Sequence, residues 1–78
     1  MPKRKYNKIQ LDILRSLRTK QMTIYQIAKK TKTDFRTIRH QLILLKGLDY
    51  VHLAFEHDHI RVFAITNEGY TYMRRLER

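Results

Sequence analysis

The stretch that most constrains the fold of this chain runs from Met22 to Leu48, with the sequence MTIYQIAKKTKTDFRTIRHQLILLKGL. Thr23 is followed three residues later by Gln26, and this spacing is typical of a capping box at the start of a helix. Asp34 is a favourable N-cap for a second helix. Apolar residues recur at helical spacing after both starts, at Ile24, Ile27 and Ala28 and again at Ile38, Leu42 and Leu45. The stretch therefore predicts two short amphipathic helices joined by a tight turn.

The second of these helices is predicted from Phe35 to Lys46, with Gly47 as its C-terminal stop. Ile43 and Leu44 are also apolar, but they do not lie on the same side of the helix as Ile38, Leu42 and Leu45. We therefore expect neighbouring elements to bury them. Away from that apolar side the helix carries four polar residues: Arg36, Thr37, Arg39 and His40.

A longer helix is predicted to precede this pair and to begin at Asn7, which forms a second capping box with Gln10, while Tyr6 packs on Leu11. Its core side is expected to carry Tyr6, Ile9, Ile13 and Leu17. Leu11 and Leu14 fall outside this side, which predicts a surface for a partner. The basic residues before it, 1–5, are predicted to form a tail that is either solvated or an arm on phosphates.

After Leu48 the pattern changes to that of strands. Segments 50–55 and 60–65 are rich in β-branched and aromatic residues, and the polar segment 56–59 between them predicts a hairpin with a loop at its tip. Thr66 or Asn67 is expected to cap a last helix, with Tyr70, Met73 and Leu76 inward and Arg74, Arg75 and Arg78 outward. The predicted fold is mainly α with a small β-hairpin, as one domain over residues 6–78.

Composition narrows the classes of partner and activity. With 78 residues the chain supports one compact domain, and 17 basic against 7 acidic residues give a net charge of +10, which indicates a polyanionic partner. No apolar run approaches the roughly 18 residues of a membrane span and no export signal opens the chain, so a cytoplasmic location is expected. Cysteine is absent and glycine is scarce, which leaves no disulfide, no thiolate nucleophile and no glycine-rich phosphate loop. The sequence therefore predicts a binding protein with no enzymatic activity and no cofactor.

Three segments resemble the winged helix-turn-helix transcription regulators of the broad group that includes the ArsR, MarR and PadR families. The first is 24–31 (IYQIAKKT), similar to the second helix of these proteins; the second is 37–42 (TIRHQL), similar to their recognition helix. The third is 63–69 (FAITNEG), similar to the segment that closes the wing and opens the last helix. The chain departs from the family pattern at two places. One is the end of the second helix of the pair, which lies close to Gly47. The other is the turn between the two helices, where Lys32 replaces a frequent glycine and must accept an unusual backbone conformation unless the turn differs.

The resemblance implies a regulator that binds double-stranded DNA as a homodimer, with the helix near 35–46 in the major groove and the hairpin near 50–65 on the flank. The polar residues Arg36, Thr37, Arg39 and His40 would read bases, because arginine donates two hydrogen bonds to guanine. If neighbouring elements do not bury Ile43 and Leu44, one of them would pack on the wing or contact a thymine methyl group. Phosphate or wing contacts are expected from Lys29, Lys30, Lys32, His57, His59 and Arg61, and a dimer interface from Leu11, Leu14, Tyr72 and Leu76.

Two alternatives remain open at this stage. One is a metal site built from His52, His57, His59 and Asp58, since imidazole and carboxylate suit zinc or nickel. The other is a winged-helix module that binds protein or RNA without reading DNA sequence, which an even spread of positive charge would favour. The resemblance further suggests a small archaeal or viral protein, in the host cytoplasm if viral, with no small-molecule effector.

Overall fold

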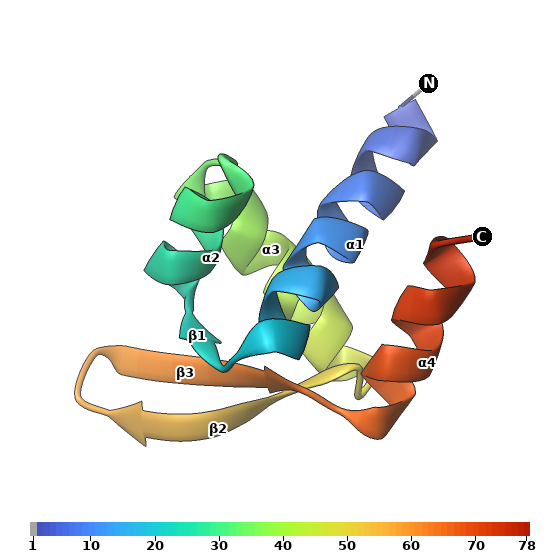
Figure 1. Cartoon of the computed structure of the whole chain (residues 1–78). Helices are drawn as coiled ribbons and strands as arrows, with labels where there is room; N and C mark the ends of the chain where they lie inside the picture. The colour runs from blue at the N-terminus through green and yellow to red at the C-terminus, as the bar shows by residue number, and fades with distance from the viewer. Residues whose placement is uncertain (1) are drawn as a thin grey trace.

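The computed structural model describes the backbone of residues 2–78 and the side chains of residues 7–78 (Figure 1). Three strands form one antiparallel sheet in the order β1-β3-β2. The helices α2 and α3 form the two-helix motif, and β2 with β3 forms the wing, which confirms the predicted winged helix-turn-helix fold. The elements in chain order are α1 (Pro2–Thr19), β1 (Met22–Thr23), α2 (Ile24–Thr31), α3 (Phe35–Gly47), β2 (Val51–His57), β3 (Ile60–Ile65) and α4 (Asn67–Leu76).

Helix α1 begins at Pro2, so the predicted start at Asn7 is wrong. Proline suits the first position of a helix because its missing N–H would have no partner there. Gln10 consequently caps nothing: its side-chain amide donates to Gln41 Oε1 at 3.0 Å, and its carbonyl accepts the Tyr72 hydroxyl at 2.8 Å. Residues 2–5 are the first residues of this helix rather than a separate tail, while the predicted contact of Tyr6 lies outside the described side chains.

The structure confirms the local features predicted for α2, α3 and the turn between them. Thr23 and Gln26 form the predicted capping box on α2, with hydrogen bonds of 3.2 and 2.9 Å. Asp34 caps α3 by accepting the backbone N–H of Thr37. Lys32 takes the left-handed backbone conformation (φ 55°) that its position in place of glycine required, and its N–H reaches the last carbonyls of α2.

The end of α3 differs from the prediction. Gly47 is the last residue of the helix and has no positive φ, so it is not the stop that the sequence suggested. Leu48 caps the helix by donating to the Leu44 carbonyl, and the chain reverses at Asp49, which takes the left-handed conformation (φ 64°). Aspartate tolerates this conformation better than most residues, because its short polar side chain bonds locally.

The sheet is larger than the predicted hairpin. Met22 and Thr23 pair with Phe63 and Val62 of β3 and so add the short strand β1. Strand β3 has its predicted bounds, whereas β2 runs two residues past its predicted end to His57. A tight turn at Asp58 (φ 53°) therefore replaces the expected loop over 56–59. A register irregularity between Leu53 and Phe55 interrupts the pairing of β2 with β3.

All elements contribute to one core, and its members correct three predictions. Leu14 was expected outside the core side of α1 but is completely buried, because α1 is packed against α2 and α3 as well as α4. Tyr70 was expected inward but is 40% exposed, and Ile43 and Leu44 were expected to be buried but lie exposed on α3. The buried residues that form this core are Ile13, Leu14, Leu17, Met22, Ile27, Ile38, Leu42, Leu45, Val51, Phe63 and Met73.

Helix α4 is attached to the rest of the protein by close backbone contact. Thr66 caps it, as predicted, by accepting the Gly69 N–H at 2.9 Å, and the same hydroxyl donates to the Asp49 carbonyl at 2.6 Å. A Cβ atom on Gly69 would lie 1.9 Å from the Tyr50 carbonyl oxygen. Only glycine fits here, so α4 faces the core through Gly69 and Met73, and Tyr70 is turned outward.

Candidate nucleic-acid interface

The exposed side of α3 is fixed by what its other side buries. Ile38, Leu42 and Leu45 are buried in the core, and Gln41, only 2% exposed, is held by the amide of Gln10. A helix seated on three apolar side chains and one directional hydrogen bond cannot rotate without breaking them. The remaining face of α3 therefore has a defined orientation toward solvent.

On that face the structure brings together most of the predicted base readers. Arg36, Arg39 and His40 are all exposed, and Ile43, at 60% exposure, lies next to the arginines as an apolar element among them. Neither α2 nor α3 contains an acidic residue, and no ion pair of the described residues involves either helix. The cations on this face are therefore free to meet an external anion.

Thr37 differs from the other predicted readers. Its hydroxyl donates to Asp34 Oδ1 at 2.7 Å and its backbone N–H donates to Asp34 Oδ2 at 3.0 Å. Both hydrogen bonds from Thr37 lower the pKa of Asp34 below the ordinary value of 3.8, and the one from the hydroxyl has the larger effect. Thr37 is thus engaged in the helix cap, and Asp34 stays ionised at the N-terminus of α3, where the helix dipole favours a negative charge.

The predicted wing residues are exposed but partly engaged with one another. Arg61 Nε lies 3.1 Å from Glu56 Oε2, because the two residues are directly opposed in the register of β2 and β3. His57 Nε2 lies 3.4 Å from Asp58 Oδ2. Because both pairs are exposed to solvent, they contribute little to stability. The guanidinium of Arg61 keeps other N–H donors available for a phosphate.

Sequence reasoning missed a cleft between the two-helix motif and the wing tip. Tyr25 and Phe35 form its aromatic wall with ring centroids 4.7 Å apart, and Tyr25 is 73% exposed. The cleft has a volume of about 400 Å³ and is lined by Thr23, Ile24, Tyr25, Phe35, Arg39, Asp58, His59, Ile60 and Arg61. The sequence indicated this cleft only through the aromatic residue at the start of each of the two helices. No local pattern predicted that these residues would lie near the wing.

The lysines expected to contact phosphates lie along α2 and the turn that follows. Lys29, Lys30 and Lys32 are exposed, and Lys30 Nζ lies 3.4 Å from the hydroxyl of Thr19. Lys29 and Lys30 share a surface hollow with Lys20, Met22 and Gln26, and the phosphate contacts of these lysines stay a prediction.

The predicted dimer interface is only partly available at the surface. Leu14 is completely buried and cannot contact a partner, which corrects that expectation. Leu11, Tyr72 and Leu76 are half-buried, and the Tyr72 ring stacks on Tyr50 at 4.3 Å. Burial raises the pKa of Tyr72 above its usual 10.0, an effect that Tyr50 reinforces and Arg75 opposes.

For the metal alternative, the described part of the chain holds no group of three or more His, Cys, Asp or Glu side chains placed to bind a metal ion. No described helix is long and apolar enough to cross a membrane.

A model of the family described as "Bacterial regulatory protein, arsR family" matches residues 7–52, which is more than half of the chain. The match extends from α1 through the two-helix motif to the start of the wing. No curated protein matches the chain. The family match agrees with the fold and with the cationic outer face of α3, and the chain therefore belongs to the ArsR family of helix-turn-helix proteins, which are DNA-binding transcription regulators.

Proposed function

We propose that this protein recognises a specific sequence of double-stranded DNA, with α3 in the major groove and the wing on the flanking backbone, and regulates transcription there. The observation that carries the proposal is the outer face of α3, where Arg36 and Arg39 are exposed, unpaired with any acid among the described residues, and held in place by a buried opposite side. Ile43 adds an apolar group suited to a thymine methyl. Lys29, Lys30 and Lys32 supply cations for the phosphates.

Selection of bound sequences from a random duplex pool tests this function directly. Arg36→Ala or Arg39→Ala should lower affinity for the selected sequence by about 5- to 150-fold and relax the preference at one base pair, because a bidentate arginine contact contributes about 1–3 kcal/mol of discrimination. Lys29→Ala should weaken selected and random duplexes alike. Arg18→Ala on α1 serves as a matched control and should leave the preference unchanged. A pool in which no sequence becomes enriched would contradict the proposal.

The homodimer and the absence of a small-molecule effector stay predictions. Of the four predicted interface residues, Leu11, Tyr72 and Leu76 remain partly exposed, since Leu14 lies in the core. Sedimentation of the wild type against Leu11→Glu tests the dimer, because the exposed part of Leu11 is the part that a partner would cover. A monomeric wild type at micromolar concentration would exclude it.

One observation favours the alternative function, a winged-helix module for protein or RNA. The segment 22–65, which holds the two-helix motif and the wing, carries seven basic and four acidic residues, while the rest of the chain carries ten basic and three acidic residues. Positive charge is therefore not concentrated on the DNA-reading part. The selection experiment separates the two functions, because a module of this kind would enrich no duplex sequence.

A further inference from the structure

The DNA contacts of α3 and of the wing leave the cleft between them unused. Its volume of about 400 Å³ is within the range of small-ligand sites. Arg39 lines the cleft from the exposed face of α3 and Arg61 lines it from the wing, whose tip extends past the start of α2 (Figure 1). A duplex that contacts both α3 and the wing would cover the opening between them. The occupant that fits this position is therefore part of the DNA itself.

The cleft has an aromatic wall that the core does not use. Tyr25, at 73%, is the most exposed large apolar side chain of the described residues. Its ring lies against that of Phe35, with centroids 4.7 Å apart and ring planes inclined by 32°. Neither ring belongs to the core, and Ile24 and Ile60 continue the apolar lining. An apolar wall that ends in an open aromatic ring suits a planar group that stacks on it.

The charges around the cleft indicate how such a group is attached. Asp58 lines the cleft at the turn of the wing, and its carboxylate opposes a phosphate placed beside it. The same carboxylate can accept a hydrogen bond from the amino group of a base. Arg39 and Arg61, by contrast, attract phosphates. The combination suits a nucleotide whose base lies against the rings and whose phosphates lie at the arginines.

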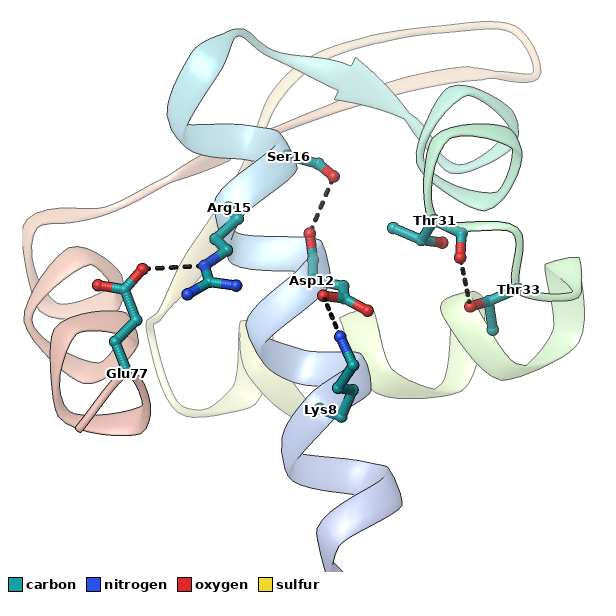
Figure 2. Close-up of polar contacts among 7 residues, drawn as sticks. All are labelled: Lys8, Asp12, Arg15, Ser16, Thr31, Thr33 and Glu77. Carbon is teal, nitrogen blue, oxygen red and sulfur yellow. Dashed lines mark hydrogen bonds and ion pairs between the residues drawn. The ribbon is translucent and has the colours of Figure 1, made fainter.

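Both arginines have donors available for this purpose. On α1, Arg15 is held by Glu77, with Nε 2.9 Å from Oε2 (Figure 2). Arg39 belongs to no ion pair of the described residues. Arg61 uses Nε on Glu56 at 3.1 Å, which leaves the other N–H groups of its guanidinium for a phosphate.

The state of the base follows from the geometry of DNA. In a paired duplex the faces of the bases are covered by their neighbours, so only a base outside the stack can present a face to Tyr25. Extruding a paired base costs free energy, and this cost is smallest for a base that is already unpaired. A single unpaired nucleotide beside the bases that α3 contacts is therefore the best occupant.

We propose that the cleft binds one unpaired base of a DNA strand, stacked on Tyr25, between the bases that α3 contacts and the backbone that the wing contacts. The inference rests on the proposed function, which positions the duplex. The protein consequently binds most tightly to its sequence when one nucleotide there is unpaired, as in a bulge.

Matched bulged duplexes test the proposal. Each duplex carries the sequence selected from the random pool and one extra nucleotide, whose position is varied along both strands through the site and its flanks. A second set carries an abasic residue at the same positions. At one position the wild type should bind the bulge that has a base about 5- to 150-fold more tightly than the abasic bulge, which is the range that stacking of one base on an aromatic side chain supplies.

Two substitutions at one position separate stacking from other effects. Tyr25→Ala should abolish the preference for the base, whereas Tyr25→Phe, which keeps the ring, should preserve it. Because Tyr25 is highly exposed and outside the core, both proteins should fold as the wild type does. Arg36→Ala is the matched control, since Arg36 lies on the outer face of α3 and does not line the cleft. It should weaken binding of every duplex that carries the selected sequence and leave the preference for the base unchanged.

The possible results separate this inference from the proposed function. A wild type that binds its intact sequence but shows no preference for the base at any position would overturn the inference alone. A preference that survives Tyr25→Ala would also overturn it. If Tyr25→Ala weakened intact, bulged and abasic duplexes equally, the rings would contact the sugars of a paired strand instead. A wild type that binds no duplex would contradict both proposals.

Discussion

Gly69→Ala should destabilise the protein, although alanine is the better helix former by about 1 kcal/mol. An added Cβ would lie 1.9 Å from the Tyr50 carbonyl oxygen, 1.1 Å short of the 3.0 Å below which a neighbour must shift. The neighbour is backbone that also accepts the Thr66 N–H at 3.1 Å, while the Thr66 hydroxyl bonds the Asp49 carbonyl. The start of α4 and the strand entry at Tyr50 must therefore separate.

The size of the effect follows from opposing contributions. Overpacking costs about 1–3 kcal/mol and a weakened hydrogen bond about 1 kcal/mol, against the gain of about 1 kcal/mol in helix propensity. The net loss is about 1–3 kcal/mol, which for a domain of this size lowers Tm by about 4–24 °C. Urea unfolding followed by circular dichroism measures it, and the midpoint should fall without a change in m.

Gly47 provides the matched control on α3. No heavy atom of the described residues lies within 4 Å of a Cβ built there, and its φ is not positive. Gly47→Ala should therefore raise the free energy of unfolding by about 0.5–1 kcal/mol. A Gly69→Ala protein as stable as the wild type, or a pair of variants that shift the midpoint alike, would refute the packing argument.

Three more outcomes are expected. Asp34→Ala should lower stability near neutral pH and make no difference in strong acid. The pKa of Asp34 is lowered in the folded protein, so its ionised form stabilises the fold above the ordinary aspartate pKa of 3.8, and this contribution disappears as pH falls through the lowered value. The unfolding midpoints of the two proteins should therefore converge as pH falls below 3.8. Tyr72→Phe should cost about 0.5–1.5 kcal/mol, because it removes the hydroxyl donor to Gln10 and keeps the stack on Tyr50, and a calorimetric Tm equal to that of the wild type would contradict this. Duplex affinity should fall with salt at a log–log slope of about −0.9 per phosphate contacted, and an affinity independent of salt would argue against phosphate contacts.

Features whose physical cause is local in sequence could be predicted. The caps at Thr23, Asp34 and Thr66 each depend on a side chain and a backbone N–H three residues away, and all three are present. The exposure of Arg36 and Arg39 follows from the same helical period that buries Ile38 and Leu42. Local caps and periodicity also predicted the order of the elements, and the family resemblance added the unusual backbone at Lys32.

Features that depend on pairing between distant segments could not be predicted. Strand β1 has two residues, and only its partners Phe63 and Val62 make it a strand. Leu14 is buried because a second helix covers its side of α1, which the periodicity of α1 alone does not show. For the same reason the Arg61 ion pair depends on the cross-strand register, and the cleft of Tyr25 depends on where the wing tip ends.

The start of α1 shows a different limit. Asn7 and Gln10 have the spacing of a capping box, but a proline five positions upstream is an equally good start, and local signals do not choose between them. The structure uses Gln10 for α3 and Tyr72 instead of for a cap.

This use of Gln10 has a consequence for how the reading helix can evolve or be redesigned. Tyr72, Gln10 and Gln41 connect α4, α1 and α3 in one chain of two hydrogen bonds, on the side of α3 that faces inward. Contacts between leucine side chains tolerate small displacements between helices, whereas the directional hydrogen bond between the amides of Gln10 and Gln41 does not. This chain of hydrogen bonds therefore fixes the position and tilt of α3. None of its members lies on the outer face. The outer residues can therefore be replaced to recognise a new operator, while the contacts that hold α3 in place stay the same.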